Sequence, residues 1–103
     1  MERSGDRLSV TTFAGGWTLA GEIDAASAVE LTEAFTQIPT VADGIVAVDV
    51  AGVTFIDSSG VRILLELASR VAAVGGRLTL RNPSAPVSKI IEITGLESTF
   101  GLA

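Results

Sequence analysis

The sequence predicts an α/β domain in which a mixed β-sheet packs against helices. Two strand-like segments near the start, residues 8–13 and 17–23, are joined by a glycine-rich turn, which is typical of an antiparallel hairpin. After this hairpin, helical patterns alternate with strand-length apolar runs, an order that favours parallel pairing across helical connections. The 103 residues suffice for one small domain with its own core.

The hairpin turn is expected at Ala14-Gly15-Gly16, because glycine adopts the backbone angles of tight turns without steric cost. Asp24 follows the second strand and offers an N-cap for a first helix. Pro39 is expected to end this helix, because proline disfavours helical geometry in the residue before it. Apolar residues recur at helical spacing between these limits, at Ala28, Leu31, Ala34, Phe35 and Ile38.

A central strand is predicted at residues 45–50, where a nearly continuous apolar run is typical of a strand covered on both faces. Asp49 within this run is interpreted as structural. The chain continues through residues 51–56 to a polar junction, and a second helix is predicted at about residues 59–74. Its apolar face is expected to lie in the core, and Gly75-Gly76 is expected to end it in a left-handed conformation.

The last third of the chain predicts one more strand and helix. Residues 77–81 alternate polar and apolar side chains, and Ser84 is expected to cap a third helix after a turn. Gly95 ends that helix, with Leu96 placed to pack back on its last turn. Residues 100–103 are a candidate final strand. The sheet is therefore expected to have four to five strands.

Composition and charge exclude several classes of function. The net charge is −5, and the seven cations are dispersed along the chain, which argues against binding nucleic acid or an anionic membrane surface. The sequence has no cysteine, in agreement with a reducing compartment. It shows neither the apolar segment of a signal peptide nor a run of about 20 apolar residues for membrane insertion. A cytoplasmic location is expected.

Three consecutive residues that can cap a helix, Asp57-Ser58-Ser59, stand before the second helix. One cap is enough for a helix start, and Ser59 is expected to provide it. A spare hydroxyl beside the positive end of a helix suits a serine that carries phosphate part of the time. Asp57 is open to two interpretations, a cap or a partner contact. Gly60 either lets a partner backbone approach or clears a neighbouring loop.

No catalytic site is predicted. A nucleophilic serine needs a nearby base, and the chain has no histidine. The glycine pairs do not open a helix with a following lysine, so no phosphate-binding loop is indicated. Glu22 with Asp24 resembles a catalytic or metal-binding carboxylate pair only loosely. We therefore expect a protein that is not an enzyme and that needs neither cofactor nor metal.

Several motifs in order along the chain resemble a known family. They are Gly21-Glu22-Ile23-Asp24, Val48-Asp49-Val50, the segment from Val53 through Asp57-Ser58-Ser59-Gly60-Val61, Gly75-Gly76 and Ile93-Thr94-Gly95-Leu96. Together they resemble the bacterial STAS domain, specifically the anti-sigma factor antagonists. The resemblance implies a STAS fold with three to four helices and one domain at residues 8–103, and the charged residues 1–7 are expected to be a flexible segment. Members usually carry another helix after the last strand, whereas this sequence stops at Ala103. Three alternatives stay open: an exposed apolar surface, a surface covered by a partner subunit as in a homodimer, or a shortened sequence.

The resemblance also implies a mechanism. In such antagonists the unphosphorylated form captures an anti-sigma factor that is a serine kinase, and the sigma factor is released. The kinase phosphorylates the first serine of the motif, here Ser58, which breaks the complex, and a phosphatase reverses the modification. Such switches act in transcription regulation and stress responses. The residues expected to contact the partner are Glu22, Asp24, Asp57, Ser58, Ser59, Gly60 and Arg62.

A second class of function stays open. A STAS domain can instead serve as a scaffold or accessory subunit of a sensory or lipid-transport complex, without a kinase switch. The intact Asp-Ser-Ser-Gly motif favours the antagonist.

Overall fold

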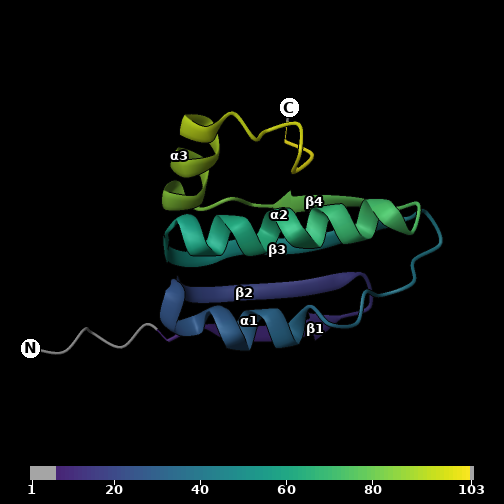
Figure 1. The fold of residues 1–103 in the computed structure, drawn as a ribbon, viewed down its shortest axis with the longest axis horizontal. Coiled ribbons are helices and arrows are strands. Elements are labelled where there is room, and N and C mark those ends of the chain that lie inside the picture. Colours follow the sequence, from purple (N-terminus) through teal and green to yellow (C-terminus); the bar gives the residue numbers. More distant parts are fainter. Residues whose placement is uncertain (1–6, 103) are drawn as a thin grey trace, which may run out of the picture.

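A four-stranded mixed sheet forms the centre of the protein (Figure 1). The structure, a computed structural model, describes residues 7–102. In sequence order the elements are β1 (Ser9–Phe13), β2 (Gly16–Ile23), the short 3-10 helix η1 (Ala25–Ser27), α1 (Ala28–Ala34), β3 (Ile45–Ile56), α2 (Ser58–Ala73), β4 (Arg77–Arg81) and α3 (Ala85–Thr94). The strands lie in the order β1-β2-β3-β4. β1 pairs with β2 antiparallel, whereas the pairs β2–β3 and β3–β4 are parallel, which confirms the mixed sheet.

The core lies between the sheet and its helices. Figure 1 shows α1 and α2 on the same side of the sheet. Strand β2 turns its alternate residues Trp17, Leu19 and Ile23 into this core, where each is at most 2% exposed. The Trp17 ring meets the Phe35 ring edge to face, with centroids 4.7 Å apart. Of the apolar face predicted for the second helix, Val61, Ile63, Leu64, Leu67 and Val71 are buried as expected. At its end the prediction is wrong for Ala72 and Val74, which are exposed.

The opposite face of the sheet is much more open. In β3, Val46, Val48 and Val50 are buried, while Ile45 on the other face is 38% exposed. The expectation of a strand covered on both faces is therefore wrong for Ile45, although Ala47 is buried. Asp49 also lies on this face, and its carboxylate accepts hydrogen bonds from Ala51 N and from Asn82 Nδ2. These two bonds support the structural interpretation of Asp49.

The third helix lies beside the second half of β3. Strand β4 pairs with β3 only from Ile45 to Asp49, and α3 contacts β3 and buries Val87 and Ile91. As predicted, α3 ends at Gly95, whose φ is 69°, and Leu96 N donates to Ile91 O. Ser84 occupies the N-cap position, but its side chain makes no capping hydrogen bond.

The first helix differs from the prediction at its end. Asp24 caps it as expected, but the first turn is the 3-10 helix η1 and α1 ends at Ala34, well before Pro39. A contact that is distant in sequence accompanies this early end. The guanidinium of Arg70 in α2 donates to Phe35 O at 2.7 Å and to Thr36 O at 3.0 Å. These carbonyls are thereby satisfied without further helical turns.

The predicted strand at residues 100–103 is wrong for the part that the structure describes. Residues 98–101 form turns, in which Gly101 N donates to Ser98 O and Gly101 adopts a φ of 70°. Phe100 is 1% exposed, and its carbonyl accepts from Leu80 N in β4. The tail therefore packs against β4 without joining the sheet. Ala103 lies outside the described residues, as do residues 1–6 of the segment expected to be flexible.

Candidate functional site

Two neighbouring strands end side by side and place two carboxylates at one edge of the sheet. Ile23 of β2 pairs with Ile56 of β3, and Asp57 N donates to Ile23 O at 3.2 Å. Asp24 and Asp57 are the next residues on these two strands, and both are half-buried. Figure 1 shows this end of β2 and β3 beside the start of α2. The carboxyl ends of parallel strands are a common position for binding sites.

The cap of α2 is Asp57. Its backbone is extended, with φ −116° and ψ −172°, and its Oδ1 accepts from Ser59 N at 2.9 Å and from Gly60 N at 3.2 Å. The expectation that Ser59 caps the helix is therefore wrong, because α2 already begins at Ser58. A carboxylate at this position interacts favourably with the positive end of the helix dipole.

Ser58 is the first residue of α2 and is exposed. Because Asp57 accepts the two capping bonds, the Ser58 hydroxyl is not needed as the cap of the first turn. Ser59, by comparison, is half-buried. Arg62 lies four residues after Ser58, hence on the same side of the helix, and is also exposed. Of the two serines, Ser58 is the one whose oxygen a modifying enzyme can reach more easily.

Gly60 allows α2 to approach the ends of β2 and β3. A Cβ atom at this position would lie 2.6 Å from Ile23 Cγ2 and 2.9 Å from Ile56 Cγ1. Both distances are too short for carbon atoms, so a side chain here would push the helix away from the strands. Gly60 is buried. Of the two interpretations, the packing supports the one in which glycine clears the neighbouring β2 segment, and partner contact through Gly60 stays a prediction.

The loop after β2 is held by a residue that the sequence reasoning missed. Ser27 N donates to Asp24 Oδ1 at 3.1 Å, and Asp24 N donates to Ser27 Oγ at 3.0 Å, which together form a capping box. Ser27 Oγ also lies 3.1 Å from Glu22 O, to which it can donate. The sequence contains a signal for this capping box, because Ser27 follows Asp24 at the spacing Asp-x-x-Ser. The box holds Glu22 and Asp24 beside the start of α2.

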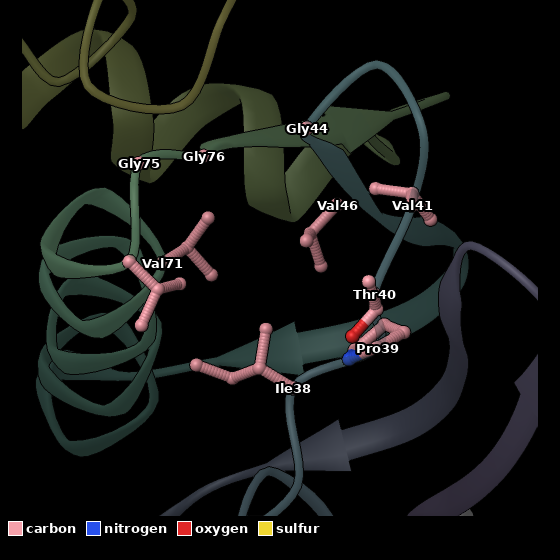
Figure 2. A pocket seen from close by; sticks show the side chains of 10 residues that line it. Ile38, Pro39, Thr40, Val41, Gly44, Val46, Val71, Gly75 and Gly76 are labelled. Carbon is pink, nitrogen blue, oxygen red and sulfur yellow. The ribbon is translucent and has the colours of Figure 1, made fainter.

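A cavity of about 270 Å³ lies at the other end of α2 and does not include the predicted site residues (Figure 2). In Figure 2 the side chains of Ile38, Val46 and Val71 surround it, and Gly75 and Gly76 form one rim. No titratable side chain lines this cavity. Because α2 has 16 residues, its two ends are about 24 Å apart, too far for one small ligand to touch both the cavity and Ser58.

In residues 7–102, no group of three or more His, Cys, Asp or Glu side chains is placed to hold a metal ion. No helix in the same range is both long and apolar enough to cross a membrane. The predicted site residues come together around the start of α2, where Ser58 and Arg62 are exposed and the carboxylates beside them are half-buried.

Comparisons with known proteins identify the family. A family model described as "Mlab, STAS domain" matches residues 11–102. A 45-residue segment is 42% identical to the anti-sigma F factor antagonist of Lysinibacillus sphaericus, and this match spans 44% of the chain but only 38% of that relative's length. Among solved structures, an anti-sigma factor antagonist from Mycobacterium paratuberculosis matches at 28% identity and a TM-score of 0.64, over 91% of this chain and 81% of the other.

The fold is also that of the anti-sigma factor antagonist SpoIIAA. Its unphosphorylated form matches at 24% identity and a TM-score of 0.66, over 89% of this chain and 84% of the other. Its phosphorylated form, from Bacillus, matches at 23% identity and a TM-score of 0.58, over 89% and 86%. These matches confirm the resemblance inferred from the sequence motifs. The chain belongs to the STAS-domain family.

Proposed function

We propose that this protein is an anti-sigma factor antagonist whose binding to its partner is controlled by phosphorylation of Ser58. The observation that carries the proposal is the exposed Ser58 hydroxyl at the first position of α2, next to a cap that Asp57 alone supplies. The antagonists among its relatives support this assignment. SpoIIAA, a protein of the same fold, exists in a phosphorylated and an unphosphorylated form.

The proposed partner is an anti-sigma factor that is also a serine kinase. The unphosphorylated protein binds it through the surface around Ser58 and so releases the sigma factor. The kinase transfers phosphate from ATP to the Ser58 oxygen, and a phosphatase removes it. The antagonist itself is not an enzyme in this scheme, because it only binds and accepts phosphate, and it works in the cytoplasm.

Electrostatics give the switch a physical basis. Phosphoserine adds about −1.5 to −2 charges at neutral pH. At Ser58 this charge stands beside the Asp57 carboxylate and on the same edge as Asp24. Within the free protein, the helix N-terminus offsets part of the repulsion. A partner surface pressed against the site would have to desolvate the phosphate, and a hundredfold loss of affinity requires only about 2.7 kcal/mol.

The alternative is a scaffold or accessory subunit without a kinase switch. One observation keeps it in view, since the matching family model is named after MlaB and not after an anti-sigma factor antagonist. The two proposals differ in what happens at Ser58. An accessory subunit needs no modification of this residue, whereas the antagonist loses its partner on modification.

Pull-down from extracts of the source cells tests the choice, with wild-type protein, Ser58→Ala and Ser58→Asp as baits. We expect wild type and Ser58→Ala to retain a serine kinase and Ser58→Asp to release it. Ser69→Asp is the matched control, because Ser69 is an exposed serine further along the same helix. Equal recovery of the same partners by Ser58→Asp and Ser69→Asp would contradict the switch. Mass spectrometry after incubation with the purified kinase and ATP should place the phosphate on Ser58.

A further inference from the structure

An aromatic side chain stands exposed next to the switch site on the face of the sheet opposite α1 and α2. Phe55 is 42% exposed and lies in β3, two residues before Asp57. It pairs across the strands with Glu22 of β2. The next pair, Ile23 with Ile56, is buried in the core, so the alternation of side chains places Glu22 and Phe55 on the outer face.

The neighbours of Phe55 along β3 are small. Ala51, Gly52 and Thr54 in the same strand are all exposed. The exposed 42% of Phe55 is the part of this aromatic residue that another protein can contact.

Without Phe55, the predicted site contains no large apolar side chain. Five of its seven residues carry carboxylates or hydroxyls, Gly60 has no side chain, and Arg62 adds an exposed guanidinium. Stable interfaces, by contrast, have an apolar core with few charges, and a few aromatic or arginine side chains carry most of the binding energy. Phe55 is joined to the site through its pairing with Glu22 and through the short connection to Asp57.

We propose that the surface for the anti-sigma factor kinase extends from Ser58 around the end of β3 onto the outer face of the sheet, with Phe55 as its aromatic anchor. This inference rests on the proposed function. The kinase then presents an apolar pocket for Phe55 next to the groups that face Ser58. Phe55 supplies affinity in this arrangement, and the charge state of Ser58, at the edge of the same contact, decides whether the complex forms.

A second exposed phenylalanine provides a matched control. Phe13 is 40% exposed and pairs with Gly16, at the start of β2. Glu22, near the other end of β2, is the residue that pairs with Phe55. Glu22 lies six positions after Gly16 along the strand, a distance of about 20 Å. A change at Phe13 therefore alters exposed aromatic area equally but lies away from the proposed contact.

The kinase that Ser58→Ala recovers from the extract is first purified. Isothermal titration calorimetry then measures the dissociation constant of its complex with each variant. We expect Phe55→Ala to raise Kd at least about tenfold, as expected for an aromatic anchor, and Phe13→Ala to leave it within about twofold. Melting temperatures are compared in parallel. Should Phe55→Ala fail to fold, Phe55→Thr provides the same test, because a β-branched side chain suits an exposed strand position.

The outcomes separate this inference from the proposed function. If wild type binds the kinase and Ser58→Asp releases it, but Phe55→Ala binds as tightly as wild type, the anchor is refuted and the switch stands. An equal loss with Phe13→Ala likewise refutes the specific role of Phe55. If wild-type protein binds no kinase, the proposed function is overturned and the anchor with it.

Discussion

Replacing Gly60 by alanine tests whether packing or partner contact requires glycine at this position. The new Cβ would lie 2.6 Å from Ile23 Cγ2 and 2.9 Å from Ile56 Cγ1, so the helix or the strands must shift. Overpacking of this kind costs about 1–3 kcal/mol, while alanine in a helix gains about 1 kcal/mol over glycine. Because the shorter contact would be 2.6 Å, we expect a cost in the upper part of this range, about 2–3 kcal/mol, and hence a net loss of about 1–2 kcal/mol in the free energy of unfolding. For a domain of this size each kcal/mol lowers Tm by about 4–8 °C.

Thermal unfolding followed by circular dichroism measures the effect, and a second substitution checks its cause. Ile23→Leu removes the methyl branch at Cβ that the alanine would strike. The double variant Gly60→Ala/Ile23→Leu should therefore lose less stability than the two single variants together. A Gly60→Ala protein as stable as wild type would refute the packing argument. Loss of partner binding at unchanged stability would instead favour the interpretation in which Gly60 admits a partner backbone.

Three further predictions concern the same end of the molecule. Asp57→Ala should cost about 1 kcal/mol in unfolding free energy, measured by urea denaturation, because it removes the cap of α2. Asp57→Asn should keep most of the stability, because asparagine is also a good cap. Weaker partner binding by Asp57→Asn, measured by calorimetry, would therefore reveal a partner contact. Arg70→Ala should cost about 1–2 kcal/mol, because it removes the donors to Phe35 O and Thr36 O, and faster amide exchange confined to α1 would identify the mechanism. Phosphorylation of Ser58 should leave the circular dichroism spectrum unchanged and shift Tm by no more than about 5 °C, since the residue is exposed at a helix N-terminus; unfolding on phosphorylation would contradict a switch that acts through the interface.

Much of the fold could be predicted from the sequence, because it depends on interactions between residues that are close along the chain. The hairpin follows from Gly15 and Gly16 between two strand patterns, although Gly16 itself already belongs to β2. The ends of α2 and α3 follow from Gly75 and Gly95, which both adopt the left-handed conformation that glycine tolerates best. The position of Ser58 at a helix mouth follows from an apolar run, a group of cap formers and a helical pattern. These features depend on residues within one or two turns of each other.

Other features depended on contacts between residues that are far apart in the sequence, which no local pattern predicts. The first helix stops at Ala34, and the carbonyl of the next residue, Phe35, accepts a hydrogen bond from Arg70, 35 residues after Phe35 in the sequence. The tail at Phe100 packs against β4 without extending the sheet, since its turns direct the chain away from an extended path. Three adjacent residues could each have capped α2, so the sequence did not identify Asp57 as the cap. Helix starts are in general defined only to within one or two residues.

The sequence by itself determined the order of the elements and the serine at the helix start, because hydrophobic periodicity, glycine conformation and capping chemistry act over a few residues. The family followed from the resemblance of several short motifs to those of STAS domains. Only the tertiary structure decided that Gly60 lies against Ile23 and Ile56, and that Phe55 stands exposed beside Glu22. The physical reason is strand register. Pairing between β2 and β3 sets which side chains share a face, and this register arises from the packing of the whole sheet against its helices.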